Sequence, residues 1–399
     1  MLSEVSNNKY AMLFCFEINR GGETLAIRSV IKQLKRDKRL EVTEFSSDTF
    51  YDSEPVYLFK WLTKNLIYWF LKFFNDRQKY SWIITTTYTA GFMACLFKVF
   101  RKYSMCFYYQ GNRIPPINLK LTPLRQLVHI FLRRIILILN YIFLCALDII
   151  IVPSEYSFKE LTDRYNFLRN KIVIVPNGID TEVFHSISKN KKKIIRTRFG
   201  LQDETNVIMY IGRLHPQKGV KSLIGAFQLL TNRNKDSRLV IVHPKGFIQE
   251  EKQHEQSLHR YIHNYHIQGI TFLNPDLRDV PSMYNLADLV VLPSRVDHFP
   301  LVMLEALASG VPFLATPVGA MGHILESIDS RLILHAGSAL EIARGIERVL
   351  SLSQGEEKKI HLNSIKLVSK YSWKYISNRI LSVLRNLNNN RSNEGVRKI

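Results

Sequence analysis

The sequence predicts an α/β protein in which two doubly wound parallel sheets form two domains. Four segments share the order of apolar strand, polar loop and periodic helix, which is typical of parallel sheets covered by helices. The chain has 399 residues, enough for two domains of ordinary size. A polar stretch at 181–206 interrupts the periodicity, and we interpret its run Lys191–Lys193 as a solvated surface. We therefore expect domains at 1–183 and 184–370, a helix at 371–387 and a frayed tail at 388–399.

The first two of these segments lie in the first domain. An apolar strand at 10–18 precedes Gly21 and Gly22, and a helical period then continues to Leu34. Adjacent glycines let a backbone approach a phosphate or a sugar, although a simple tight turn also explains them. A second strand, at 171–175, precedes a polar loop. Ligands of such sheets bind beyond the carboxyl ends of the strands, so we expect the site in these loops.

The third segment carries two basic side chains between two glycines. A strand at 207–211 precedes a loop from Gly212 to Gly219 and a helix at 220–230. Within the loop, an Arg fork and a Lys point charge suit the two phosphates of a nucleotide diphosphate. A basic surface loop is the alternative interpretation. The two side chains are Arg213 and Lys218.

The fourth segment places two carboxylates, Asp297 and Glu305, on either side of a predicted helix start. The strand at 288–293 leads to a helix that we expect to begin at Pro300, because proline is tolerated there. A strand at 311–316 follows. The first amides of a helix have no intrahelical acceptor and, with the helix dipole, form a site for phosphate. Here these amides belong to Leu301 and Val302.

The net charge of +21 is unevenly spread along the chain. Residues 57–147 hold thirteen Lys or Arg against one acid. The aromatic and aliphatic stretch 57–74 carries a stripe with a period of four, formed by Lys60, Lys64, Tyr68 and Lys72. A helix of this kind is either buried with one wet edge or lies on an anionic membrane. The apolar run 132–151 contains too many polar residues to assign as a membrane span, and we predict a long helix that leads into a strand at 148–153.

Other motifs exclude several kinds of site. The four cysteines lack metal-like spacing, and we expect buried free thiols in a reducing compartment at Cys15, Cys95, Cys106 and Cys145. The N-terminus lacks the pattern of a secretion signal. The phosphate-binding Gly-x-x-x-x-Gly-Lys motif, Gly-x-Gly-x-x-Gly and Asp-x-Asp do not occur. We interpret His215, His243 and His298 as loop side chains and expect no metal.

Five motifs in this order resemble the landmarks of the retaining glycosyltransferases of family 4. The likeness extends from about Tyr10 to Leu387. It implies the GT-B fold, in which two Rossmann-like domains face a cleft and the last helix returns to the first domain. The motifs are Asp148–Ser154, Val175–Asp180, Gly212–Gly219, Asp297–Glu305 and Tyr371–Trp373.

The resemblance implies a role for each matched side chain. Arg213 and Lys218 would neutralise the diphosphate as the sugar–phosphate bond breaks. Glu305 would hold the ribose hydroxyls, and Asp297 would hold a hydroxyl of the transferred sugar. The base would be read near Leu273–Asp276, and no metal or other cofactor would be needed. The remaining donor-binding residues would be Gly21, Gly22, Gln110, Gly212, Asn274, His298, Phe299, Pro300, Leu301 and Val302.

The chain departs from the pattern of the family at three places. Asp297 stands where the family usually has Glu and is one methylene shorter. Gln110 precedes Gly111 where His-Gly is usual, and Gln forms hydrogen bonds but does not titrate near neutrality. The stretch 242–246 replaces a glycine-rich turn.

We thus expect a retaining, metal-independent glycosyltransferase, peripheral on the cytoplasmic face of an anionic membrane. It would move a sugar from a UDP-, GDP- or ADP-sugar, bound by the second domain, to a lipid-linked or cell-envelope glycan bound by the first, as in lipopolysaccharide or polysaccharide biosynthesis. Nucleic acid is not an expected partner, since no nucleic-acid module is found. Two alternatives remain: a non-catalytic GT-B protein whose basic half binds membrane or another polyanion, and a nucleotide-sugar epimerase.

Overall fold

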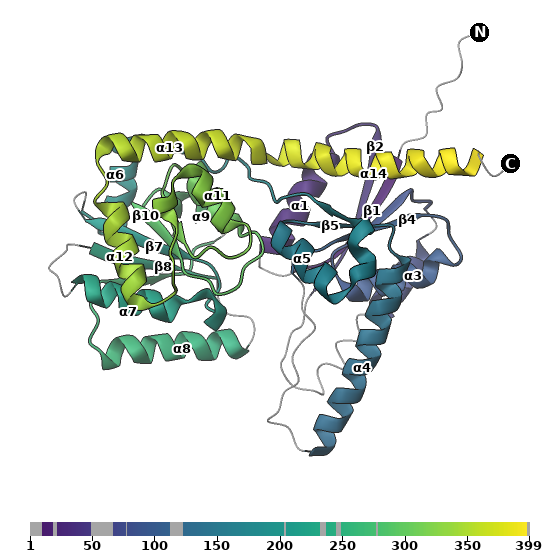
Figure 1. Cartoon of the computed structure of the whole chain (residues 1–399), viewed down its shortest axis with the longest axis horizontal. Helices are drawn as coiled ribbons and strands as arrows, with labels where there is room; N and C mark the ends of the chain where they lie inside the picture. The colour runs from purple at the N-terminus through teal and green to yellow at the C-terminus, as the bar shows by residue number, and fades with distance from the viewer. Residues whose placement is uncertain are drawn as a thin grey trace, which may run out of the picture. The chain divides into compact units, whose positions relative to one another are not determined.

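A computed structural model describes residues 10–18, 22–48, 67–76, 78–111, 123–202, 205–231, 237–244, 249–276 and 278–396. The chain forms two compact units, each built on a parallel sheet (Figure 1). Unit 1 comprises Met1–Val175 and Ser377–Ile399, and unit 2 comprises Pro176–Ile376.

The sheet of unit 1 has the order β2-β1-β3-β4-β5-β6, and all its pairs are parallel. Its strands are β1 (Tyr10–Ile18), β2 (Leu40–Asp48), β3 (Trp82–Thr85), β4 (Ser104–Tyr108), β5 (Ile149–Val152) and β6 (Ile172–Ile174). The helices are α1 (Gly22–Leu34), α3 (Tyr88–Lys98), α4 (Pro123–Ala146), α5 (Glu155–Arg164), an unlabelled helical segment at 67–75 and most of α14 (Trp373–Val396). The predicted first strand and the long helix before β5 are confirmed.

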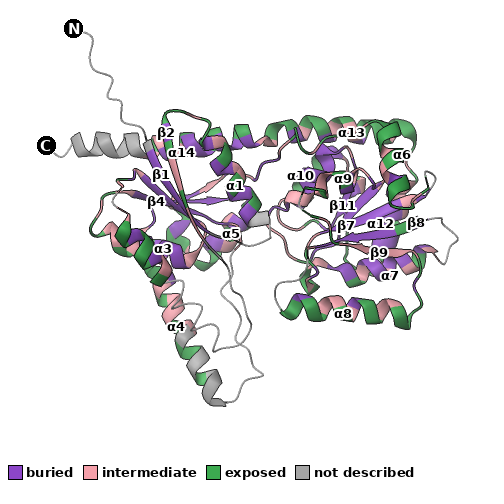
Figure 2. Ribbon diagram, turned by 180° about the vertical axis from the view of Figure 1, so that it is seen from behind, coloured by how far each residue is buried: buried purple, intermediate pink, exposed green. Residues whose placement is uncertain are grey.

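The central strands of unit 1 are apolar along their whole length because helices cover both faces of the sheet. Every residue of β3, β4 and β5 is buried, and Figure 2 shows β4 in purple. At the amino end of β5, Asp148 accepts hydrogen bonds from Lys98 Nζ at 2.9 Å and from the Met105 amide at 2.7 Å. This carboxylate therefore joins the end of α3 to the start of β4.

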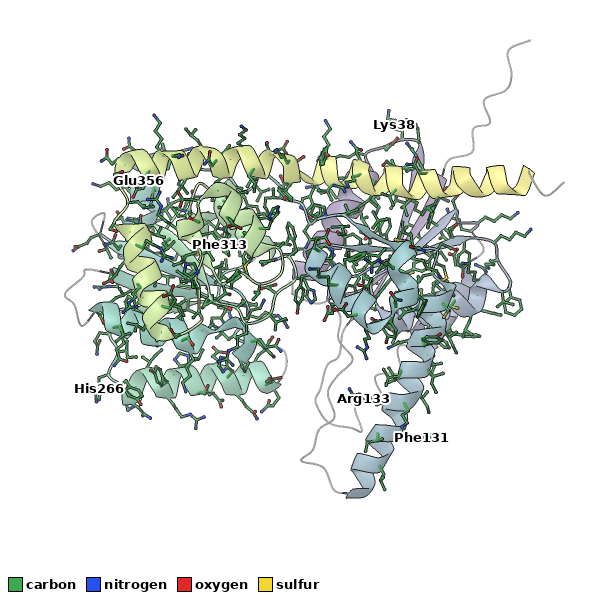
Figure 3. The ribbon with its side chains drawn as sticks, viewed as in Figure 1. Lys38, Phe131, Arg133, His266, Phe313 and Glu356 are labelled. Carbon is green, nitrogen blue, oxygen red and sulfur yellow. The ribbon has the colours of Figure 1, made fainter. Side chains whose placement is uncertain are left out.

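The sheet of unit 2 has the order β11-β10-β7-β8-β9 and is also parallel. Its strands are β7 (Asn206–Ile211), β8 (Ser237–Val242), β9 (Ile270–Leu273), β10 (Leu289–Leu292) and β11 (Phe313–Ala315). Its helices are α6 (Lys189–Arg198), α7 (Val220–Thr231), α8 (Gln249–Asn264), α9 (Val280–Tyr284), α10 (Leu301–Ala308), α11 (Met321–Ile328), α12 (Ala339–Leu350) and α13 (Gln354–Val368). Figure 3 labels Phe313, a fully buried side chain of this core.

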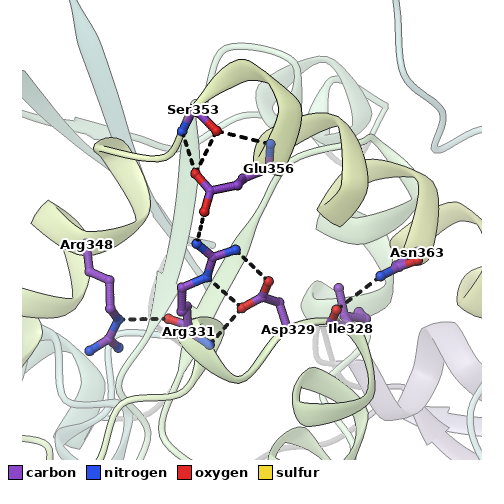
Figure 4. A network of polar contacts seen from close by, with 7 residues as sticks. All are labelled: Ile328, Asp329, Arg331, Arg348, Ser353, Glu356 and Asn363. Atoms are coloured by element: carbon purple, nitrogen blue, oxygen red, sulfur yellow. Dashed lines mark hydrogen bonds and ion pairs between the residues drawn. The ribbon is translucent and has the colours of Figure 1, made fainter.

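An ion-pair network fastens the start of α13 to the turn after α11 (Figure 4). Arg331 bridges Asp329 at 2.8 Å and Glu356 at 2.5 Å. Glu356 also closes a capping box with Ser353. Hydrogen bonds from Ser353, and then from Arg331, lower the pKa of Glu356 to about 2. Because these groups are solvent-screened, the network fixes the position of α13 more than it adds stability.

The unit boundaries lie a few residues away from the predicted ones. Unit 2 begins at Pro176 rather than after residue 183, because the following segment is bound to unit 2. The Asn177 amide donates to the Phe299 carbonyl at 3.2 Å, and Ile179 forms a bridge with Ser372. Unit 2 likewise extends to Ile376, beyond the predicted limit at 370.

Two local predictions need correction. We predicted that the last helix ends near Leu387, but α14 continues to Val396. That the last residues of the chain fray stays a prediction. A helix propagates at little cost once it is nucleated, and no proline stops this one. The thiols of Cys15 and Cys106 are buried, and burial raises their pKa values, whereas Cys145 on α4 is exposed and Cys95 is half-buried.

The amphipathic stretch 57–74 is described only from residue 67 onward, so Lys60 and Lys64 lie outside the described residues. Within the described part, Tyr68 donates to the Ser46 carbonyl and Lys72 lies 5.4 Å from the Phe45 ring. These two members of the stripe therefore contact β2. Within the described ranges, no helix is both long and apolar enough to cross a bilayer.

Candidate functional site

The topology of unit 2 brings two of the predicted loops together. From β7 the chain adds β8 and β9 on one side, then crosses to add β10 and β11 on the other. The loops after β7 and β10 therefore meet at the switch point, where ligands of doubly wound sheets bind. A backbone hydrogen bond of 2.8 Å from Arg295 to Gln217 joins them directly.

Lys218 and Asp297 form an ion pair between these loops. Lys218 Nζ lies 2.6 Å from Asp297 Oδ2, and the two side chains are 21% and 12% exposed. The other carboxylate oxygen accepts the His298 amide at 3.2 Å. Since an ammonium group has three N–H donors and this contact uses one, Lys218 retains the capacity to bind an anion while Asp297 fixes its position.

Two glycines allow this close approach of the loops. Gly219 has φ +72°, and a Cβ there would lie 2.2 Å from the Pro293 carbonyl oxygen. Gly319, after β11, has φ +61°, and its Cβ would lie 2.3 Å from the Asp297 carbonyl oxygen. Any larger residue would push the loop of Asp297 away. Sequence reasoning identified Gly219 but missed Gly319, which no motif marks.

Arg213 is held by a side chain that the sequence analysis did not identify. Its guanidinium lies 3.1 Å from Oε1 of Glu251, a buried carboxylate on α8. Its carbonyl accepts the Tyr210 hydroxyl at 2.7 Å. The Arg213 side chain is still 51% exposed, so it can contact a ligand. Glu251 lies 38 residues away in sequence, and nothing local links it to this loop.

Glu305 on α10 is buried, with 8% exposure, and accepts a hydrogen bond of 2.5 Å from the Tyr284 hydroxyl. Burial raises the pKa of Glu305 to about 7, although the bond from Tyr284 acts in the opposite direction. Burial also raises the pKa of Tyr284. At neutral pH this carboxyl is therefore close to its titration midpoint, which suits a group that exchanges hydrogen bonds with a hydroxyl ligand.

The start of α10 lies one residue later than predicted. Pro300 is the N-cap residue, with φ −69°, and the first turn begins at Leu301. Leu301 and Val302 form the first turn and are partly exposed. The first amides of a helix have no intrahelical acceptor. The helix start itself is therefore confirmed, and its use as an amide site for phosphate stays a prediction.

Three motifs that are far apart in sequence contact one another near the start of α10. They are Val175–Asp180, Asp297–Glu305 and Tyr371–Trp373. The Phe299 ring lies 5.9 Å from the Tyr371 ring, and its carbonyl accepts the buried Asn177 amide. A Cβ at Gly178 would lie 2.6 Å from the Trp373 ring. Asn177 and Tyr371 therefore support the loop that carries Asp297, a role not assigned to them from the sequence.

The other predicted donor residues follow strands, as expected, or begin a helix. Gly212 follows β7 with φ +150°, and exposed Asn274 follows β9. In unit 1, Gln110 follows β4 and its side chain hydrogen-bonds Tyr108, while Gly22 begins α1. Gly21 lies outside the described residues.

Two of the three loop histidines, His215 and His243, lie near a glutamate. His215 Nε2 lies 3.4 Å from Glu250, and His243 Nε2 lies 3.6 Å from Glu255. Across the described parts of the chain, no group of three or more His, Cys, Asp or Glu side chains is arranged to hold a metal ion.

Comparison with known proteins identifies relatives of both units. The description "Glycosyl transferases group 1" matches residues 191–366, and "Glycosyltransferase Family 4" matches residues 30–183. Curated relatives include D-inositol 3-phosphate glycosyltransferase of Corynebacterium aurimucosum, 28% identical over 57% of this chain and 54% of that protein. Lipopolysaccharide 1,2-N-acetylglucosaminetransferase of Salmonella typhimurium is 28% identical over 59% of this chain and 62% of its own. The match thus spans little more than half the length of these relatives.

Solved structures share the fold of nearly the whole chain. Sucrose-phosphate synthase from Thermosynechococcus elongatus has a TM-score of 0.75 at 17% identity and covers 95% of this chain and 99% of its own. HepE from Anabaena, in complex with UDP and glucose, has a TM-score of 0.72 at 18% identity and covers 94% and 100%. The two sheets, the motif order and these matches agree: the protein has the GT-B fold and belongs to the family 4, group 1 glycosyltransferases.

Proposed function

We propose that the protein is a retaining, metal-independent glycosyltransferase that takes a sugar from a nucleotide diphosphate sugar. The observation that carries this proposal is the pairing of Lys218 with Asp297 beside the first turn of α10. A cation, a carboxylate and the first amides of a helix then lie at one sheet edge, a combination that suits an anionic, hydroxyl-rich ligand. Glu305, on the same helix, supplies a buried acceptor.

Each group has a part in the proposed transfer. Arg213 and Lys218 would stabilise the negative charge that grows on the diphosphate as the glycosidic bond breaks. The amides of Leu301 and Val302 would bind phosphate oxygens. Glu305 would accept the ribose hydroxyls. Asp297 would accept a hydrogen bond from a hydroxyl of the transferred sugar. Its contact with Lys218 would fix the position of the carboxylate.

We further propose a UDP-sugar as the first donor to test, since the structures of HepE hold UDP, UDP-glucose, or UDP and glucose. For the acceptor, we propose a lipid-linked or cell-envelope glycan at an anionic membrane. Two observations support this choice: the relatives include a lipopolysaccharide glycosyltransferase, and residues 57–147 hold thirteen basic side chains against one acid. The site of action would be the cytoplasmic face of that membrane.

Thermal denaturation with UDP, GDP and ADP tests the nucleotide. A ligand that binds only the folded state raises the melting temperature, and the correct nucleotide should raise it most at equal concentration. Hydrolysis or transfer of the matching nucleotide-sugar then tests the activity. Equal and negligible shifts with all three nucleotides, together with no turnover of any donor, would refute the proposal.

Two further measurements test the finer claims. The anomeric configuration of the product, followed by proton NMR from the start of the reaction, should match that of the donor. Turnover should persist in excess EDTA. An inverted product would overturn the retaining assignment, and loss of activity that Mg²⁺ restores would overturn metal independence. Conversion of the donor into a different nucleotide-sugar would instead identify an epimerase.

A further inference from the structure

A cluster of exposed aromatic rings lies on unit 1, where helical residues 67–75 pack against the end of α3. The Phe70 ring lies 5.7 Å from the Phe74 ring and 5.8 Å from the Phe97 ring. Although Phe97 is half-buried, Phe70 is 46% and Phe74 is 63% exposed. The cluster therefore presents a continuous apolar surface to solvent.

The turn after α3 extends this surface with two more apolar side chains. Val99 is 81% exposed and Phe100 is 83% exposed, the highest values among the exposed large apolar side chains of the described residues. Lys98 precedes them and Arg101 follows, with its guanidinium 6.0 Å from the Phe97 ring. Contiguous apolar surface of this kind usually marks a contact with another protein or a membrane. We call Phe70, Phe74, Leu96, Val99 and Phe100 the apolar rim.

A basic pocket adjoins the apolar rim. It has a volume of about 390 Å³ and is lined by Ser81, Lys98, Arg101, Lys102, Tyr103 and Ser104. The ammonium group of Lys98 is paired with Asp148 at 2.9 Å, so the net positive charge comes mainly from Arg101 and Lys102. Two cations beside hydroxyl groups form a site that suits a phosphate oxyanion.

The charge around the rim favours an anionic partner. Residues 67–104 contain six Lys or Arg and a single acid, Asp76. A bilayer that contains anionic lipids presents phosphates beside an apolar interior, which matches cations set directly beside exposed Val99 and Phe100. A protein partner would need an apolar centre with an acidic border.

The rim and the expected ligand loops lie at opposite ends of the strands of unit 1. Ser81 and Ser104 stand at the amino ends of β3 and β4, and α3 runs from the opposite edge of the sheet to Lys98. The loops expected to bind ligands lie at the carboxyl ends of the strands. A bilayer bound at the rim therefore leaves the carboxyl edge of this sheet accessible. Phe131, on α4, is also exposed (Figure 3).

We propose that the apolar rim and the basic pocket form a docking site for an anionic lipid bilayer. Val99 and Phe100 enter the boundary between headgroups and acyl chains, and Arg101 and Lys102 contact lipid phosphates. The inference deepens the proposed function, on which it rests for the membrane-bound acceptor, but the docking site is testable without any sugar transfer.

Sedimentation with vesicles tests the site. The full chain should bind mixed vesicles of phosphatidylcholine and phosphatidylglycerol. It should bind pure phosphatidylcholine vesicles at least tenfold more weakly, because attraction between the basic side chains and anionic headgroups adds to the free energy of burying apolar side chains. Val99→Ser with Phe100→Ser should weaken binding to the mixed vesicles at least tenfold. Arg101→Glu with Lys102→Glu should remove the preference for phosphatidylglycerol.

Matched controls come from exposed positions of unit 2. Leu362→Ser with Tyr265→Ser changes two side chains that are each 57% exposed, and should leave binding unchanged. Lys366→Glu with Lys370→Glu changes the net charge by the same amount as Arg101→Glu with Lys102→Glu and should keep most of the preference for phosphatidylglycerol. Since Val99 and Phe100 lie outside the core, their variant should melt within about 2 °C of wild type.

Several outcomes would overturn the docking site. Binding that is equal for the rim variants and the controls would place the membrane contact elsewhere. Binding that does not depend on phosphatidylglycerol would remove the role of the basic pocket. If wild type is a dimer in analytical ultracentrifugation and Val99→Ser with Phe100→Ser is a monomer, the rim joins two copies of the chain instead. Nucleotide-induced stabilisation, measured in parallel, shows whether the proposed function survives any of these results.

Discussion

The hydroxyl of Tyr284 donates a hydrogen bond to the buried carboxyl of Glu305, 21 residues later in the sequence. This contact joins the short helix α9 to α10 at the candidate donor site. Burial favours the protonated form of Glu305, whereas the Tyr284 hydrogen bond favours the carboxylate. The balance leaves the pKa of Glu305 at about 7. The proposed contact with ribose hydroxyls uses the carboxylate, whereas the stability of the folded protein favours the protonated form.

Glu305→Gln should stabilise the protein at alkaline pH. The folded-state pKa of Glu305 is raised from 4.5 to about 7, so its favourable contribution is present below pH 4.5 and is lost as pH rises through 7. The shift corresponds to on the order of 3 kcal/mol at pH 8 and above. Chemical denaturation of wild type and variant at pH 5 and pH 8.5 measures it. A stability difference that is the same at both pH values would contradict the assignment.

Tyr284→Phe should make nucleotide binding more dependent on pH. Without the hydroxyl, the pKa of Glu305 rises further, so less carboxylate is present at pH 7 to accept ribose hydroxyls. We expect about fivefold weaker binding at pH 7 and recovery toward wild type near pH 9. Calorimetric titration across pH 6 to 9 checks this. Tyr375→Phe, at an exposed position, is the control. A uniform loss at every pH would mean that Tyr284 only supports the fold.

Lys218→Ala should lower kcat/KM by about 10² to 10³, because it removes a cation that stabilises charge developing on the diphosphate. Lys221→Ala is a close control: Lys221 lies on α7 with its ammonium 5.2 Å from the Tyr261 ring. Steady-state turnover of the nucleotide-sugar measures both. Equal activity of the two variants would show that Lys218 does not stabilise the diphosphate.

The Lys218–Asp297 pair should also be visible in stability. Lys218→Ala leaves a mostly buried carboxylate without its cation, so the melting temperature should fall. Removing Asp297 as well, in Lys218→Ala with Asp297→Ala, should restore part of the loss because no unpaired charge remains. If the fall in melting temperature of the double variant equals the sum of the falls of the two single variants, the two side chains do not interact in solution.

Gly219→Ala should destabilise unit 2 far more than Gly200→Ala. Both glycines have a left-handed backbone, with φ +72° and +66°. A Cβ at Gly200 meets nothing within 4 Å, so only backbone strain of about 1 kcal/mol is expected. At Gly219 the same Cβ would lie 2.2 Å from the Pro293 carbonyl oxygen, so the loop must move. Denaturation midpoints and nucleotide binding compare the two, and similar effects would contradict the close approach of the loops.

Local sequence pattern predicted the elements well because strand and helix periods are properties of short segments. The strand at 207–211, the loop 212–219 and the helix that follows all lie where the pattern indicated. The errors concern the ends of elements, such as the extension of α14 to Val396. Packing against neighbouring elements and helix propagation determine where an element ends. The exposure of Cys145 was missed because apolar neighbours in sequence do not fix which side of a helix is covered.

The sequence by itself determined that this protein has two doubly wound sheets. It also placed Arg213, Lys218 and Asp297 on loops that follow strands, and Glu305 on the helix after such a loop. Only the tertiary structure decided the partners. Lys218 meets Asp297 across 79 residues because β7 and β10 are neighbours, and strand order is set by packing of the whole sheet. Tyr284 and Glu251 belong to no motif, and the motif that contains Asn177 gave that side chain no role. Their roles follow from burial and distance, which are properties of the folded chain alone.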